Sequence, residues 1–264
     1  MDVEEGALKH GLPYFALGAG RTLVVLRGLQ TTHANPAGFE RSMELRVVRP
    51  LAARFRVYAV GRGPGMAKGT TMADIAAQHA EALADRFGGP VDVLGVSSGG
   101  SVALQMAADH PRSVRRLVVA ASGYKLGPVA KQAQLDWASA VERGRRGLHV
   151  NARLASPSPV VRALLTPVMW LMDPFTRPEV PGDFVAFVHA EDAFDLGDRL
   201  PEITAPTLVV GGDRDVAYPV GYFRRTAEGV ADGRLIVYPG TGHVGTLMHK
   251  RFADDVRAFL AEGE

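Results

Sequence analysis

The chain has 264 residues, of which 47% are hydrophobic and 22% charged, a composition typical of a globular protein that excludes an intrinsically disordered chain. It contains no cysteine, so disulfide bonds, cysteine-ligated metal sites and a thiol nucleophile are excluded. The formal net charge is only +2, and the densest basic group, at residues 143–146, is short. We therefore expect no nucleic-acid partner.

The sequence gives no sign of a membrane segment or a secretory leader. The most apolar stretch, residues 160–172, is shorter than the roughly 18–20 residues that span a bilayer, and it contains an arginine. The first residues, MDVEEGALKHG, are acidic and have no apolar core of the kind that a secretory signal needs. We expect a cytoplasmic protein without a membrane partner.

Short apolar runs and helical patterns alternate along the chain. In chain order, the sequence predicts strands at residues 23–26 and 56–60, a helix at 72–87, a strand at 91–94, a helix at 102–108, strands at 117–120, 207–210 and 235–238, and a helix at 252–260. Continuous apolar runs are typical of parallel strands that helices cover on both faces. The alternation predicts an α/β fold with a doubly wound, mostly parallel sheet.

Residues 124–198 interrupt this alternation, because they contain no predicted strand. A polar helical stretch near residues 131–143 is followed by prolines that we expect to divide the segment into short helices. These prolines are Pro157, Pro159, Pro167, Pro174, Pro178 and Pro181. The segment is too long for a simple connection between two strands. We predict that it is a helical cap inserted into a core domain made of residues 1–123 and 199–264.

Residues 91–100 read VDVLGVSSGG and contain Gly95-x-Ser97-x-Gly99 between a predicted strand and a predicted helix. This is the context of a nucleophile elbow, in which a sharp turn lifts the serine hydroxyl above the sheet. The glycines allow strand and helix to approach closely, and the helix N-terminus favours developing negative charge. The alternative is a small-residue turn without a function.

A serine nucleophile needs a base and an acid, which in this topology follow it in the order acid, then base. The strand at 207–210 leads to Asp213 and Asp215, and the strand at 235–238 leads to a glycine-rich loop with His243. Both loops follow the carboxyl ends of strands, where open α/β sheets bind their ligands. We favour Asp215 as the acid, because Asp213 is suited to local turn hydrogen bonds. The other histidines lack this context: His10, His33, His79, His110, His149, His189 and His249.

With these motifs the chain resembles the α/β-hydrolase fold superfamily, in its form as a serine hydrolase with a helical cap, from about residue 18 to residue 259. The resemblance implies that Ser97 is the nucleophile, Asp215 the acid and His243 the base. It also implies an oxyanion hole made by the backbone amides of Ser98 and Leu29, with Gln30 as the less favoured alternative to Leu29.

Two positions depart from the family pattern. Arg27-Gly28 stands where many members have His-Gly, and Gly61 stands where many have Asp. Arg27 is expected either to hold the oxyanion loop or to bind a substrate carboxylate or carbonyl. The apolar segment 160–172 is expected to cover the active site, to pack against the core domain, or both. The candidate substrate-binding residues are Arg27, Gln30, Trp137, Met169, Trp170, Met172 and Phe175.

The resemblance implies a hydrolase that cleaves a small or medium apolar carboxylic ester, thioester or lactone through an acyl-serine, without a cofactor or a metal. The glycines at 61, 63 and 65 do not form a nucleotide-binding motif, and no zinc-ligand motif occurs. Two alternatives stay open. The same triad would serve C–C bond hydrolysis, perhydrolysis, lyase or cyclisation chemistry, or the protein would bind a ligand without catalysis. The expected partner is a small molecule with an acyl group, bound by a monomer or a homodimer.

Overall fold

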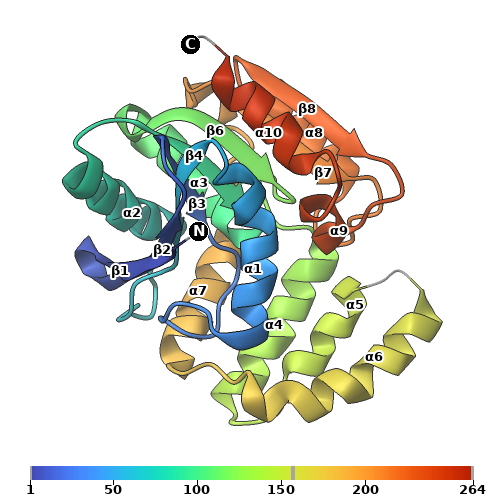
Figure 1. Ribbon diagram of the computed structural model, residues 1–264. Helices are drawn as coiled ribbons and strands as arrows, with labels where there is room; N and C mark the ends of the chain where they lie inside the picture. The colour runs from blue at the N-terminus through green and yellow to red at the C-terminus, as the bar shows by residue number, and fades with distance from the viewer. Residues whose placement is uncertain (1, 156–157, 263–264) are drawn as a thin grey trace.

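The computed structural model describes residues 2–155 and 158–262, and an eight-stranded sheet runs through its centre (Figure 1). The strand order is β1-β2-β4-β3-β5-β6-β7-β8. The strands are β1 (Glu4–Leu8), β2 (Leu12–Leu17), β3 (Arg21–Leu26), β4 (Phe55–Val60), β5 (Val91–Val96), β6 (Val114–Ala120), β7 (Thr207–Gly212) and β8 (Gly233–Tyr238).

Strands β3 to β8 pair in parallel, whereas β1 and β2 are antiparallel additions at one edge. The predicted mostly parallel α/β sheet is therefore confirmed, and each of the six predicted strands is present. The first two strands were not predicted. The α-helices are α1 (Gly38–Leu51), α2 (Met72–Phe87), α3 (Ser98–Asp109), α4 (Pro128–Glu142), α5 (Ala152–Ala155), α6 (Pro159–Met172), α7 (Pro181–Ala193), α8 (Val220–Gly229), α9 (His243–Leu247) and α10 (Phe252–Ala261).

Two apolar layers hold helices against opposite faces of the sheet. One layer contains side chains of α2, α3 and α8, and the other contains side chains of α1 and α10. The ends of α2 follow the sequence closely: the Thr71 side chain accepts a hydrogen bond from the Asp74 backbone N–H, and Gly88 at φ 71° ends the helix. Helices on both faces leave the carboxyl ends of the parallel strands as the accessible edge of the sheet.

Between β6 and β7 the chain leaves the sheet and forms α4 to α7, which gather at one end of the molecule (Figure 1). The helices α4 and α7 pack through Trp137 and Phe184, whose ring centroids lie 4.7 Å apart. Pro159 and Pro181 begin helices, as expected. Pro167 does not break its helix, contrary to prediction, because α6 gives up one intrahelical hydrogen bond and continues to Met172. Pro157 lies outside the described residues.

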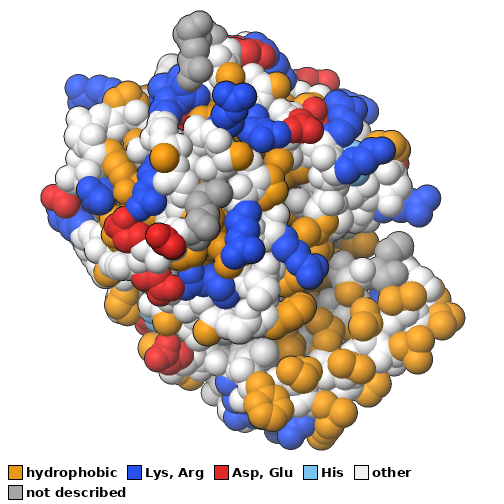
Figure 2. Space-filling view, viewed as in Figure 1, with side chains coloured by type: hydrophobic (Ala, Val, Ile, Leu, Met, Phe, Trp, Pro, Cys, Tyr) orange, Lys and Arg blue, Asp and Glu red, His pale blue; other side chains and the backbone are white. Residues whose placement is uncertain are grey.

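Helix α6 exposes apolar side chains on the surface shown in Figure 2, where they form an orange area at the lower right. Leu164 is 68% exposed, Leu171 is 61% exposed, and no residue of α6 is buried. Across the described residues, no helix is both long and apolar enough to cross a membrane.

Candidate active site

Ser97 lies at the junction of β5 and α3, with a backbone φ of 52° and ψ of −124°. A positive φ is uncommon for a residue other than glycine, and such strain tends to occur at functional sites. The flanking glycines are required by close packing. A methyl group at Gly95 would lie 2.6 Å from the Gly100 Cα atom, and one at Gly99 would lie 2.2 Å from the Leu26 carbonyl oxygen. The glycines therefore allow the turn that presents the serine.

Three side chains from distant parts of the sequence form one hydrogen-bonded row. The Oγ atom of Ser97 lies 2.9 Å from Nε2 of His243, and Nδ1 of His243 lies 2.8 Å from Oδ2 of Asp215. The three residues follow β5, β8 and β7 at the same edge of the sheet. The structure thus brings together the three residues that the sequence singled out.

The two candidate carboxylates differ in their surroundings. Asp215 is buried, and its second oxygen accepts hydrogen bonds from the backbone N–H groups of Ala217 at 2.8 Å and Tyr218 at 3.0 Å. Asp213 is exposed and accepts a hydrogen bond from the backbone N–H of Thr241 at 3.3 Å. Only Asp215 contacts the imidazole of His243. The carboxylate next to the His243 imidazole is therefore fixed by its own loop.

Near Ser97, two backbone N–H groups make no hydrogen bond to a backbone carbonyl within the described residues. Ser98 is the first residue of α3, so its N–H has no partner within the helix. Within the part of the chain that the structure describes, the Leu29 N–H makes no backbone hydrogen bond. The Gln30 side chain packs against the next loop, where its oxygen accepts from the Arg62 N–H at 3.2 Å. Leu29 and Ser98 both line the cavity beside Ser97, and Gln30 does not.

A cavity of about 270 Å³ adjoins the Ser97 and His243 side chains, and its walls are mostly apolar. The loops at the sheet edge and the helices between β6 and β7 both contribute to it. The lining residues are Leu29, Ser97, Ser98, Leu126, Ala130, Gln134, Trp137, Leu148, Asn151, Leu154, Ala217, Tyr218 and His243. Its size and apolar character suit a small ligand.

Of the aromatic and methionine side chains proposed as pocket walls, only Trp137 lines this cavity. Met169, Trp170, Met172 and Phe175 do not, so this part of the prediction needs correction. The reason is the orientation of α6 and the turn after it, which face solvent: Phe175 is 81% exposed, and the Trp170 ring packs against the Arg146 guanidinium at 3.8 Å.

Arg27 faces helix α1 and is not among the residues that line the cavity. Its Nη2 and Nε atoms lie 2.7 Å and 2.9 Å from the same carboxylate oxygen of Glu44. Burial raises the pKa of Glu44, and the charge of Arg27 opposes that rise. Of the two roles expected for Arg27, the structure favours holding the oxyanion loop over binding a substrate.

A buried acid next to Ser98 was not found from the sequence. Glu191 of α7 is completely buried and accepts hydrogen bonds from Ser98 Oγ at 2.9 Å and from the Tyr218 hydroxyl at 3.3 Å. Burial raises the pKa of Glu191, and the nearby Arg62 guanidinium opposes the rise. The Tyr218 ring stacks on His243 with centroids 5.9 Å apart. No pattern in the sequence around Glu191 distinguishes it from a surface acid.

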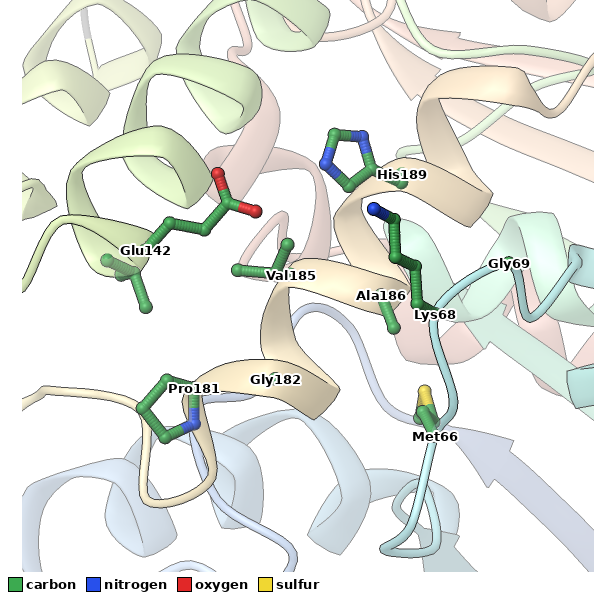
Figure 3. Close-up of a pocket in the computed structure, with 10 residues that line it drawn as sticks. Met66, Lys68, Gly69, Glu142, Pro181, Gly182, Val185, Ala186 and His189 are labelled. Atoms are coloured by element: carbon green, nitrogen blue, oxygen red, sulfur yellow. The ribbon is translucent and has the colours of Figure 1, made fainter.

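A larger hollow of about 960 Å³ lies elsewhere, between α4, α7 and the loop after β4 (Figure 3). Glu142, His189 and Lys68 project into it among apolar residues. It shares no lining residue with the cavity beside Ser97, and it holds no serine next to a base. In the described chain, no group of three or more His, Asp or Glu side chains is placed to hold a metal ion.

Comparisons with known proteins agree with this architecture. Residues 18–255 match the sequence model of the alpha/beta hydrolase family. The chain is 30% identical over 242 residues to the pimeloyl-[acyl-carrier protein] methyl ester esterase of Neisseria meningitidis serogroup B, covering 86% of this chain and 90% of that one. It is 26% identical over 281 residues to a 2-hydroxy-6-oxononadienedioate/2-hydroxy-6-oxononatrienedioate hydrolase of a Pseudomonas species, covering 99% and 95%. The enol-lactonase from Burkholderia xenovorans has the same fold, with a TM-score of 0.74, 21% identity, and coverage of 98% and 100%.

Proposed function

Because the chain belongs to the alpha/beta hydrolase family, we propose that it is a serine hydrolase that cleaves a small or medium apolar carboxylic ester, thioester or lactone. The observation that carries this proposal is the hydrogen-bonded row of Ser97, His243 and Asp215 beside an apolar cavity. Relatives with 30% identity are named as methyl ester esterases. An acyl-serine mechanism needs no other reactive group.

The proposed reaction begins when Ser97 Oγ attacks the substrate carbonyl carbon and its proton passes to His243 Nε2, 2.9 Å away. Asp215 holds the ring through Nδ1 and stabilises the imidazolium. The backbone N–H groups of Ser98 and Leu29 stabilise the oxyanion, and each such donor is worth roughly 2.7–4 kcal/mol in the transition state. The tetrahedral intermediate collapses when His243 protonates the departing alcohol or thiol. Water, activated by His243, then hydrolyses the acyl-serine.

We propose that residues 124–198 act as a cap over this cavity. Ala130, Gln134 and Trp137 line it from α4, and Leu148, Asn151 and Leu154 line it from the following short helices. The helical insertion therefore supplies about half of the lining residues, whereas the core domain supplies the reactive groups. Substitutions at these six positions are expected to change substrate preference.

C–C bond hydrolysis is a second candidate function, favoured by the likeness to the Pseudomonas hydrolase. That enzyme's name gives dicarboxylate substrates. Here, no Lys or Arg is found among the described residues that line the cavity, and a carboxylate would enter it without a cationic partner. We therefore favour a neutral ester, and assaying a dienedioate beside the esters compares the two candidates directly.

The proposal is tested with a fluorophosphonate probe and a panel of p-nitrophenyl esters. Wild-type protein should be labelled and should hydrolyse the esters, whereas Ser97→Ala should lose both properties while it stays folded. Ser113→Ala, on the short helix after α3, is the control for removing a serine hydroxyl. An unreactive wild-type protein, or labelling that persists in Ser97→Ala, would show that Ser97 is not the nucleophile.

A further inference from the structure

Two residues that line the cavity beside Ser97 each have a buried polar atom without a hydrogen-bond partner among the described residues. These atoms are Oε1 of Gln134 and Nδ2 of Asn151. Gln134 is only 7% exposed. Buried polar atoms are nearly always paired, because an unpaired one loses its interaction with water and gains nothing in return. A partner from a bound molecule would account for both atoms.

Each of these side chains lies in the middle of an otherwise apolar wall. On α4, Gln134 stands one turn after Ala130 and one turn before Trp137. In the short helices that follow α4, Asn151 stands between Leu148 and Leu154 at spacings of three residues. Gln134 and Asn151, called the polar belt below, are thus each flanked by apolar residues in the part of the lining that the helical insertion supplies.

The buried acid behind the cavity fixes which atom Gln134 presents. The Gln134 amide lies near enough to the Glu191 carboxylate to lower its pKa, and that carboxylate accepts hydrogen bonds from Ser98 Oγ and the Tyr218 hydroxyl. A carboxylate only accepts hydrogen bonds, so the NH₂ group of Gln134 is the group that suits it, and the carbonyl oxygen is left without a partner in the described chain. Asn151 presents the opposite chemistry, a donor N–H.

We propose that this polar belt is a binding site for a neutral secondary amide in the acyl or alcohol part of the substrate. The substrate C=O would accept from Asn151 Nδ2, and its N–H would donate to Gln134 Oε1. A carboxylate fits poorly, because it cannot donate to Gln134 and would approach the buried Glu191. This inference rests on the proposed function, since it names the substrate class of the same cavity.

The test compares three p-nitrophenyl esters of equal chain length. One carries an amide, the second has CH₂ in place of the amide N–H and is therefore a ketone, and the third is a plain alkanoate. The amide and ketone esters are each prepared as a series in which the polar group moves along the acyl chain one position at a time. At the best position, wild-type kcat/KM should fall about fivefold from amide to ketone and about fivefold again to alkanoate. One neutral hydrogen bond has about this effect.

Two variants show which side chain causes each of the two decreases in kcat/KM, from amide to ketone and from ketone to alkanoate. Gln134→Met should remove the preference for amide over ketone, and Asn151→Leu should remove the preference for ketone over alkanoate. Ratios between esters are compared within each variant, so a change in overall rate does not affect the result. Gln132→Met, on the exposed side of α4, is the matched control and should keep both ratios. If one variant does not fold, the other tests its own step.

Binding to Ser97→Ala separates this inference from the proposed function. Calorimetry with an N-alkyl acetamide, the matching ketone and the matching alkane reads the amide preference without turnover. Amide-selective binding together with a wild-type protein that hydrolyses no ester would refute the hydrolase and support the belt. Ester hydrolysis with equal kcat/KM for the three esters, or ratios that both variants leave unchanged, would overturn the amide site alone.

Discussion

At the scale of single residues, Asp213 and Asp215 differ in the hydrogen-bond donors that their carboxylates contact. Asp215 accepts two backbone N–H bonds from its own loop and still has one oxygen for His243. Hydrogen bonds that fix a carboxylate also fix the imidazole that it contacts. Asp213 uses an oxygen on the Thr241 N–H and has no contact with the base. The local hydrogen bonds therefore make Asp215 the orienting acid of the proposed triad.

Asp215→Asn is expected to lower kcat/KM for ester hydrolysis by about 10⁴-fold, because an amide in that place favours the wrong imidazole tautomer. Asp213→Asn is the matched control and should stay within a few-fold of wild type. Thermal unfolding of both variants would show that the fold is kept. A larger loss in Asp213→Asn than in Asp215→Asn would mean that the wrong carboxylate had been assigned.

At the scale of elements, the sequence predicted the six strands that read as apolar runs and missed the two that do not. Strands β3 to β7 are largely buried between two layers of helices, and the apolar run of β8 was recognised although this edge strand is only partly buried. Strand β1 forms the sheet edge, and three of its five residues are exposed, so no apolar pattern marks it. Strand β2 is buried but contains Pro13, which is usually confined to sheet edges and strand ends.

Parts of the candidate site were predictable for a similar reason. Ser97, Asp215 and His243 each follow a strand that the sequence identifies, so topology alone places them at one edge. The inward face of the insertion was not predictable, because α6 is apolar around most of its circumference and gives no sign of which side packs. For the same reason the sequence did not identify Glu191, because its contact with Ser98 depends on how α7 packs against the sheet and its helices.

The junction of β5 and α3 should be intolerant of added volume. Gly95→Ala would place a methyl group 2.6 Å from Gly100 Cα and 2.7 Å from Ala103 Cβ, so strand and helix must separate. We expect the free energy of unfolding to fall by about 1–3 kcal/mol, as for other overpacked sites, together with a loss of esterase activity. Gly89→Ala, in the loop before β5, meets nothing within 4 Å and is the control. Denaturant unfolding of both variants measures the difference, and equal stabilities would contradict the packing argument.

At the scale of the whole molecule, the sheet supplies a rigid edge on which three distant loops meet, and the insertion supplies the walls. This arrangement requires the layers on both faces to stay packed, because each of the three reactive loops is anchored to a different strand. Global stability and the geometry of the site are therefore linked. His79, in the layer formed by α2, makes that stability depend on pH.

His79 is almost completely buried, and its Nδ1–H donates to the Ile75 carbonyl at 2.8 Å. Burial lowers the pKa of His79 from 6.5 to about 4. As pH falls below 6.5, the unfolded chain takes up a proton at this residue, whereas the folded protein does not until the pH approaches 4. The stability from this site is therefore complete above that window and is lost as pH falls through it. The loss amounts to about 3 kcal/mol in total.

His79→Gln should therefore flatten the dependence of unfolding free energy on pH between about 4 and 6.5, whatever its effect on stability at pH 7. His189→Gln is the matched control for removing a histidine, because that side chain is exposed on α7. Urea unfolding at several pH values across the window measures both slopes. A His79→Gln slope equal to that of wild type would mean that His79 is protonated equally in the folded and unfolded states, and acid sensitivity would then have to arise from the carboxylates.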